Sequence, residues 1–323
     1  MYPFIFAPIF KERVWGGREL ERLYAKPLPA GKTIGEAWEI SDRPGDASVI
    51  ANGPFAGKDL RWLMEQHPAA ILGGAKPAAE GRFPLLCKIL DAREKLSLQV
   101  HPPASVARAL NGEPKTEMWF IADAAPVAEL YVGLKPGTTR AEFERRIGDG
   151  TVADCFARLP VRTGDTMFLP SGRVHAIGEG LVIFEIQQNS DTTYRVFDWN
   201  RVGLDGQPRA LHVAQSLASI DFNDFAPRLV EAPFVADGPL QKRALVNDPL
   251  FTVEAWQIPG GAGRELPSRQ LQIIAVTAGR LELTSGATAL TLSAGQFCLV
   301  PAAVQRAGVR AASATTLLHI RAN

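Results

Sequence analysis

Two short segments of the chain carry side chains of the types that bind a divalent metal ion. The first contains Gln99 and His101, the second ends at His175, and Glu117 lies between them. Two imidazoles, a carboxylate and an amide oxygen suit zinc, manganese, iron, cobalt or nickel better than calcium. No thiolate belongs to the set, which argues against a purely structural zinc site. The pattern predicts a metal centre with an open position, and therefore metal-assisted chemistry.

The spacing of these residues is more informative than any one of them. A lone strand histidine is more often a hydrogen-bonded structural residue than a ligand, and Glu117 alone would be a solvated charge. Gln99 and His101 are two residues apart, so on a strand they point to the same face. His175 ends the pattern Gly-x5-Pro-x-Gly-x2-His, which begins at Gly164. Together these segments predict that three strands direct four ligands into the mouth of one barrel.

The elements that would position the ligands are mostly short strands. Apolar, β-branched runs bounded by turn residues are typical of an antiparallel sandwich or barrel. Such runs cover residues 47–51, 95–100, 118–122, 166–169 and 181–186. Helical patterns are few. They cover residues 59–66, 139–147 (with Thr139 as the N-cap and Glu142 in the capping-box position), 152–159 and 213–220. We expect a mainly β fold with a few short helices.

The chain contains an internal repeat of one short sequence pattern. Residues 161–170 and 292–301 both place a turn glycine, a strand and a proline at the same spacing. The residue five positions after the proline is His175 in the first copy and Arg306 in the second. We therefore predict two β-modules. Residues 1–228 would hold the metal and a small helical insert at about 138–161, and residues 229–323 would lack metal ligands.

Composition limits the classes of partner and the compartment. The 323 residues include 35 Lys and Arg against 34 Asp and Glu, a net charge of +1, so nothing points to nucleic acid or an acidic membrane. Three scattered cysteines without a CxxC pattern favour a reducing compartment. The N-terminus lacks the basic region of a signal peptide, and no run of about 18 apolar residues is present. We expect a cytoplasmic protein that is a monomer or a weak homo-oligomer.

Longer motifs resemble the type I phosphomannose isomerases in their shorter bacterial form. The resemblance covers most of residues 10–225, whereas residues 232–323 match only loosely. The motifs are Val-Trp-Gly-Gly at 14–17, Gly-Glu-Ala-Trp-Glu-Ile-Ser at 35–41, Phe-Pro-Leu-Leu-Cys-Lys at 83–88, Leu-Ser-Leu-Gln-Val-His-Pro at 96–102, Lys-Thr-Glu-Met-Trp at 115–119 and Gln-Asn-Ser-Asp-Thr-Thr-Tyr-Arg at 188–195. The metal segments are similar to the two cupin motifs, with Gln99 in place of the usual first histidine.

The resemblance implies a fold, a cofactor and a reaction. The fold would be a pair of cupin-type jelly-roll barrels. One zinc ion per chain would be held by Gln99, His101, Glu117 and His175, of which Gln99 is the least secure. The enzyme would interconvert mannose 6-phosphate and fructose 6-phosphate through a cis-enediol, and Arg195 matches the arginine that the family places in its active site.

Other roles around the metal stay open at this point. Glu185 and Lys88 are the principal candidates for the base that moves the proton, with Lys115 a third. Glu185 has a simpler interpretation as a surface carboxylate, and Lys88 as a lysine that snorkels to the surface. For the substrate, a small sugar phosphate, we expect contacts with Ser97, Lys115 and Trp15. Trp15 has the competing interpretation of a core aromatic.

Three alternative functions compete with this one. The chain could be another metal-dependent cupin isomerase acting on glucose 6-phosphate, an iron dioxygenase, or a non-catalytic sugar-phosphate-binding cupin. The segment that ends in Arg195 argues against the dioxygenase. Intact metal ligands together with Arg195 argue, less strongly, against the non-catalytic protein.

Overall fold

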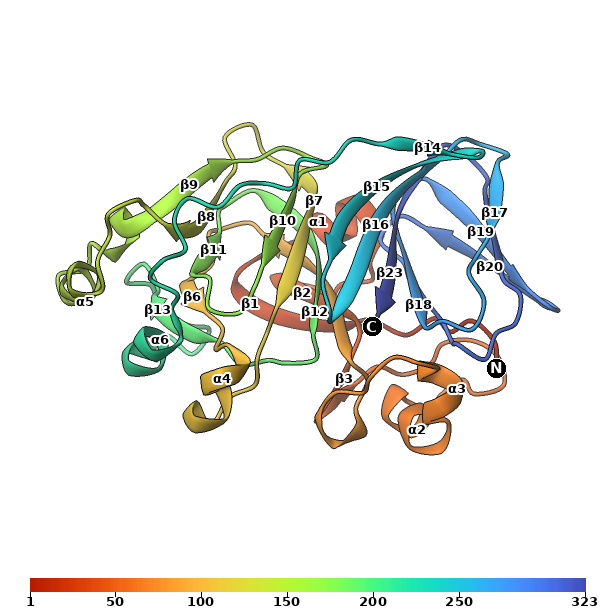
Figure 1. Ribbon diagram of the computed structural model, residues 1–323, viewed down its shortest axis with the longest axis horizontal. Helices are drawn as coiled ribbons and strands as arrows, with labels where there is room; N and C mark the ends of the chain where they lie inside the picture. Colours follow the sequence, from red (N-terminus) through yellow and green to blue (C-terminus); the bar gives the residue numbers. More distant parts are fainter.

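Two pairs of β-sheets, one pair in each half of the molecule, form most of the fold (Figure 1). The computed structural model describes all residues, 1–323. The first six-stranded sheet has the order β1 (Ile9–Gly17), β2 (Ile34–Ile40), β5 (Leu85–Ala92), β12 (Leu181–Gln188), β7 (Glu117–Ala124), β10 (Thr166–Leu169). It is paired with a five-stranded sheet of order β13 (Tyr194–Phe197), β6 (Leu98–Val100), β11 (His175–Ile177), β8 (Glu129–Leu134), β9 (Phe156–Pro160).

The second half repeats this arrangement. Its six-stranded sheet has the order β14 (Val235–Asp237), β15 (Leu240–Asn247), β16 (Phe251–Ile258), β23 (Thr315–Ala322), β18 (Gln272–Ala278), β21 (Phe297–Val300). Its four-stranded sheet has the order β17 (Gly263–Glu265), β22 (Gly308–Ala311), β19 (Arg280–Ser285), β20 (Thr288–Ser293). The strands of the two copies of the internal repeat are β10 and β21, and each forms the edge of its six-stranded sheet.

The two six-stranded sheets pack face to face. Alternate residues of β12, namely Val182, Phe184 and Ile186, belong to a shared cluster of 34 buried apolar residues that also contains Phe297 of β21. The rings of Phe184 and Phe297 stack with their centroids 5.5 Å apart. Because side chains alternate along a strand, the intervening Glu185 points into the first barrel. The sheet thus has one apolar face and one face available for chemistry.

Short helices lie at the ends and edges of the sheets. They are α1 (Glu19–Tyr24), α2 (Leu60–Gln66), α3 (Pro68–Leu72), α4 (Ala104–Ala107), α5 (Arg140–Gly148) and α6 (Val213–Ser219), with 3₁₀ turns at Ala79–Gly81, Arg108–Leu110 and Val152–Cys155. The Asp59 side chain caps α2 by accepting from the Trp62 N–H at 2.7 Å. Thr139 caps α5 by accepting from the Glu142 N–H at 3.2 Å. The sequence patterns do not indicate α1, α3 or α4.

Three predictions of local structure need correction. Residues 152–159 do not form a helix: after the 3₁₀ turn the chain becomes β9, because Leu159 pairs with Leu130 and extends the sheet edge. The strand expected over residues 47–51 is limited to β4 (Asp46–Ala47), which pairs with β3 (Asp42–Arg43), and to isolated bridges at Val49 and Ile50. The strand expected over 95–100 is β6, which starts only at Leu98.

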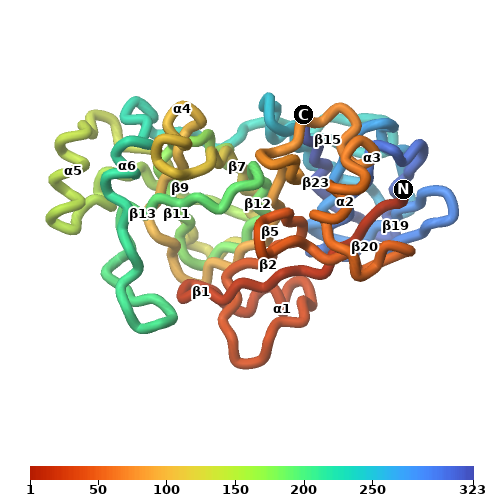
Figure 2. Tube along the Cα trace, turned by 90° about the horizontal axis from the view of Figure 1, so that it is seen from below, coloured from red at the N-terminus to blue at the C-terminus, as the bar shows by residue number.

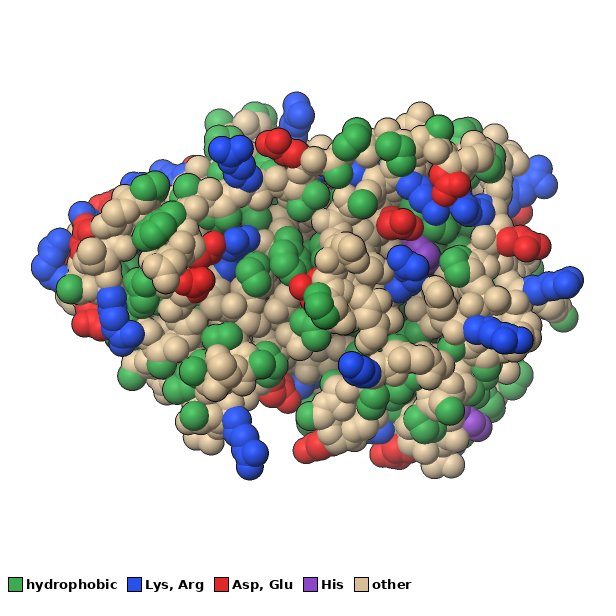
Figure 3. Space-filling model, viewed as in Figure 1, with side chains coloured by type: hydrophobic (Ala, Val, Ile, Leu, Met, Phe, Trp, Pro, Cys, Tyr) green, Lys and Arg blue, Asp and Glu red, His purple; other side chains and the backbone are tan.

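The surface agrees with the near-neutral composition. On the face shown in Figure 3, acidic and basic side chains are interspersed over both halves of the molecule. None of the helices combines the length and the apolar character that spanning a bilayer requires.

Candidate metal centre and active-site cavity

Three strands bring His101, Glu117 and His175 together inside the first barrel. His101 directly follows β6, Glu117 begins β7 of the facing sheet, and His175 begins β11. Their ligand atoms all lie within 4.8 Å of one another. Glu117 Oε2 is 3.5 Å from His101 Nε2, and Glu117 Oε1 is 3.4 Å from His175 Nε2. All three side chains are buried, so the group converges on one point between the sheets.

Backbone carbonyls fix the orientation of both imidazoles. His101 Nδ1 donates to the Thr192 carbonyl at 2.8 Å, and His175 Nδ1 donates to the Arg173 carbonyl at 2.9 Å. A proton on Nδ1 leaves the Nε2 lone pair free, which is the arrangement found behind metal-bound histidines. Burial lowers the pKa of His101 and brings the pKa of His175 to about 3. Both rings are therefore neutral near pH 7, the form that binds a metal.

The buried carboxylate of Glu117 is the part of this group that best suits a divalent cation. Burial alone would raise its pKa, but Lys115 and the two histidines hold the pKa of Glu117 well below its usual range. Neither carboxylate oxygen accepts a hydrogen bond, although both are buried. Apart from the two histidines, the only ion-pair partner of Glu117 is Lys115, whose Nζ lies 3.1 Å from Oε2. A buried anion with so few partners is costly. A divalent cation between Glu117 and the two Nε2 atoms would satisfy it, so the residues fit a metal ion.

Gln99 lies beside this group. In the five-stranded sheet, Arg195 pairs with Gln99 and Gln99 pairs with His175 across neighbouring strands, so the three side chains share one face. The Gln99 amide nitrogen is 3.3 Å from His175 Nε2. The nitrogen and oxygen of an amide exchange places when the group flips. The Gln99 oxygen can therefore face the same point as His101, Glu117 and His175.

A cavity of about 610 Å³ opens beside the metal-binding group. That volume is in the range of small-molecule sites. Its lining includes Gln99 and every residue that the sequence suggested for catalysis or substrate binding, namely Trp15, Lys88, Ser97, Lys115, Glu185 and Arg195. Trp15 is also part of the buried apolar cluster inside the first barrel, so its two interpretations both apply.

Lys88 and Glu185 form a buried pair on the wall of the cavity. They are directly opposite each other in β5 and β12, with Lys88 Nζ 3.3 Å from Glu185 Oε1. Trp119 Nε1 donates to Glu185 Oε2 at 3.1 Å. Lys88 is 3% exposed, so it does not snorkel to the surface. The pair can hold a proton next to the cavity.

Lys115 has a different environment. Its Nζ lies 3.1 Å from Glu117 Oε2 and 3.3 Å from His101 Nε2. Burial alone would lower the pKa of Lys115, but Glu117, Glu185 and Asp191 outweigh it and raise the pKa. Lys115 is therefore a cation and a poor base, which fits a binding role better than proton abstraction.

Glu36 and Arg209 are among the polar residues of the cavity that the sequence patterns did not indicate. Glu36 of β2 accepts from Trp38 Nε1 at 2.8 Å and pairs with Arg13 at 3.0 Å. Burial would raise the pKa of Glu36, but Lys88 and Arg13 bring it to about 2. Period-two alternation along β2 could have placed Glu36 on this face. No local signal marks Arg209, which reaches the cavity from a loop.

Comparisons with known proteins agree on one family. Residues 4–143 match the family model described as phosphomannose isomerase type I, catalytic domain. The chain is 36% identical over 291 residues to the mannose-6-phosphate isomerase of Streptococcus mutans, covering 90% of this chain and 89% of that protein. It is 37% identical over 306 residues to the probable mannose-6-phosphate isomerase GmuF of Bacillus subtilis, covering 93% and 94%.

Solved structures show the same fold. The crystal structure of mannose 6-phosphate isomerase from Bacillus subtilis matches with a TM-score of 0.90 at 30% identity, covering 99% of this chain and 100% of that one. A mannose 6-phosphate isomerase bound with zinc and yttrium matches with a TM-score of 0.76 at 16% identity, over the whole of both chains. With the paired sheets described above, these likenesses confirm the expected cupin-type jelly-roll fold.

Proposed function

The chain belongs to the type I phosphomannose isomerase family, and on that basis we propose that it is a zinc-dependent mannose-6-phosphate isomerase. The reaction would interconvert D-mannose 6-phosphate and D-fructose 6-phosphate through a cis-enediol, within carbohydrate metabolism. The observation that carries the proposal is the buried carboxylate of Glu117, which has no hydrogen bond and lies between two Nε2 atoms beside a cavity of about 610 Å³.

His101, Glu117 and His175 would hold the zinc ion, with Gln99 as the fourth ligand. When bound, zinc supplies a Lewis acid that stabilises negative charge on an oxygen next to the reacting carbons. A C–H bond next to a carbonyl is only weakly acidic, so removal of its proton needs such stabilisation. Arg195 would add positive charge on the same wall, because it pairs in register with Gln99.

The Lys88–Glu185 pair would move the proton between C1 and C2. Both side chains line the cavity, and Lys88 Nζ lies 3.3 Å from Glu185 Oε1, so both groups would be close to the same sugar carbons. Trp119 holds one oxygen of Glu185 in place through its indole N–H. Ser97, Lys115 and Trp15 would contact the sugar phosphate from the remaining walls.

We also propose a division of the chain into two modules, a compartment and an oligomeric state. Residues 1–228 would be the catalytic module, with the insert at about 138–161, and residues 229–323 the second module. Three free, buried cysteines support a reducing compartment such as the cytoplasm. We propose a monomer or a weak homo-oligomer.

A coupled assay for fructose 6-phosphate tests the reaction and the metal together. Purified protein is assayed on mannose 6-phosphate as prepared, after treatment with a chelator, and after zinc is restored. We expect activity that is lost with the chelator and regained with zinc. Glucose 6-phosphate in the same assay tests the alternative isomerase. A folded, zinc-loaded protein that is inactive on mannose 6-phosphate would contradict the proposal.

A further inference from the structure

A hairpin at the mouth of the cavity has no role in the function described so far. It lies between β13 and α6, and Val202 bridges to Pro208 at its base. The Gly203 N–H donates to the Gln207 carbonyl at 2.7 Å. In Figure 2 this segment projects from the body of the molecule beside β1. Leu204 at its tip is 60% exposed and lines the same cavity as Gln99, as does Arg209 where the hairpin returns.

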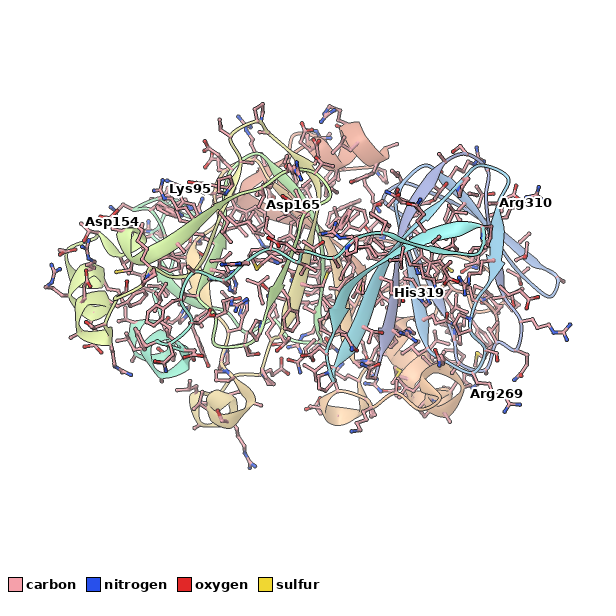
Figure 4. All side chains as sticks on the ribbon, turned by 45° about the horizontal axis from the view of Figure 1, so that its top comes forward. Lys95, Asp154, Asp165, Arg269, Arg310 and His319 are labelled. Atoms are coloured by element: carbon pink, nitrogen blue, oxygen red, sulfur yellow. The ribbon has the colours of Figure 1, made fainter.

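The hairpin is tied down at its base by one buried carboxylate. Asp198 accepts from Arg201 Nε at 3.0 Å and from Arg209 through Nε and Nη2, each at 2.6 Å. The Trp199 indole donates to the Leu96 carbonyl at 2.6 Å, and the ammonium of Lys95, labelled in Figure 4, lies 3.8 Å from the Trp199 ring centroid. Arg209 is therefore held by two bonds on one side, and its Nη1 makes no hydrogen bond.

Away from the hairpin, three cations of the cavity are each paired with a carboxylate. Arg13 pairs with Glu36, Lys88 with Glu185, and Lys115 with Glu117. Each of those cations has its own carboxylate within 3.3 Å.

At the hairpin, three guanidinium groups share Asp198. Arg201 and Arg209 contact it directly, and Arg195 makes no ion pair but feels the charges of both. Three cations with one anion have a net charge of +2. Asp205 of the hairpin also lines the cavity, where it accepts the Gln207 N–H, and its negative charge reduces the net charge of this end to +1. A phosphate monoester carries about −1.5 to −2 at pH 7, so it is attracted to this positive end of the cavity.

We infer that Arg209, positioned by Asp198, binds the phosphate group of the substrate. Arginine suits this role because its planar fork keeps free N–H donors for phosphate while Nε and Nη2 contact a carboxylate. The inference rests on the proposed function for the identity of the substrate. It does not depend on that function for the presence of an anion-binding residue at the mouth.

Arg209→Gln is the primary test, with two readouts. We expect kcat/KM for mannose 6-phosphate to fall about 10- to 100-fold, mainly through KM, because one charge-assisted contact is lost. The Kd of the zinc-loaded protein for inorganic phosphate, measured by calorimetry, should rise by a similar factor. Arg162→Gln is the matched control, because that side chain is 90% exposed and makes the same change of charge. It should stay within twofold of the unaltered protein in both readouts.

A second variant guards against misfolding. Arg209→Lys keeps the charge but cannot contact Asp198 through two nitrogens, so we expect smaller losses than in Arg209→Gln. Zinc content and thermal unfolding verify that each variant is folded. If Arg209→Gln folds and both its readouts stay within twofold of the unaltered protein, the inference is wrong. If phosphate affinity falls in Arg209→Gln but no form isomerises mannose 6-phosphate, the proposed function fails and the inference stands.

Discussion

At the scale of single residues, burial decides the charge of each group around the metal centre. His175 has a pKa of about 3 in the folded protein against 6.5 ordinarily. Below pH 6.5 the unfolded chain takes up a proton that folded His175 resists, so the free energy of unfolding of the metal-free protein should fall as the pH drops. The loss runs from pH 6.5 to about 3, at up to about 1.4 kcal/mol per pH unit for this group.

Urea denaturation of the metal-free protein between pH 7.5 and 4.5 measures this dependence. His101 adds to it in the same direction, because burial lowers its pKa too. His175→Gln removes one titrating group and should give a shallower slope. Equal slopes in the two proteins would show that His175 is not held neutral.

Arg195 gives a second prediction at this scale. Its Nη1 donates to the Ala210 carbonyl at 2.8 Å, while its buried Nε has no partner. Arg195→Ala should lower turnover by about 100-fold or more, because a preorganised positive charge at the reacting group is removed. Zinc content should stay at the level of the unaltered protein, since a guanidinium is not a ligand. Unchanged turnover would remove Arg195 from the mechanism; Arg162→Ala is the control for charge.

At the scale of elements, strand β12 divides two environments. Phe184 faces the apolar layer between the six-stranded sheets, and Glu185 faces the cavity. A shift of one residue in register would exchange these side chains. Strand β12 pairs with β5 on one side and β7 on the other, and this pairing fixes the positions of both Glu185 and Phe184.

Helix α5 offers a prediction of its own. Thr139 accepts from the Glu142 N–H, but the Glu142 side chain bonds to Arg146 rather than back to Thr139, so only half of a capping box is formed. Thr139→Ala should lower the free energy of unfolding by about 1 kcal/mol. Thr139→Ser, which keeps the hydroxyl, should change it little. Chemical denaturation compares the three proteins, and equal stability of the Ala variant would mean that the cap contributes nothing.

At the scale of the whole molecule, the apolar layer between the two six-stranded sheets joins the two halves. Phe184 and Phe297 stack across it, so each ring contributes to the stability of both halves. Phe184→Ala should cost about 3–5 kcal/mol. A double-mutant cycle with Phe297→Ala should show a coupling of about 0.5–1.5 kcal/mol.

Thermal and urea unfolding of the single and double variants measure this coupling. Phe143, buried in a separate cluster near α5, is the control partner and should add independently to Phe184→Ala. Additive effects for Phe184 and Phe297 would mean that the halves are not energetically linked through these rings.

The sequence by itself determined the features that depend on close neighbours along the chain. Gln99 and His101 share a face because strands repeat every two residues, and the turn before His175 is set by its glycine and proline spacing. The caps at Asp59 and Thr139 are equally local. The mainly β class, the repeated strand arrangement and the metal-binding group were all within reach of such patterns.

Only the tertiary structure decided what distant residues do to one another. Residues 152–159 carry an ambiguous local pattern, and the neighbouring strand β8 makes part of it a strand. Three features depend on groups that folding brings close together and removes from water. They are the ion pair of Lys88, the charge of Lys115 and the orientation of Arg209 by Asp198. Charge state and ion pairing follow from that burial, which no short window of sequence contains.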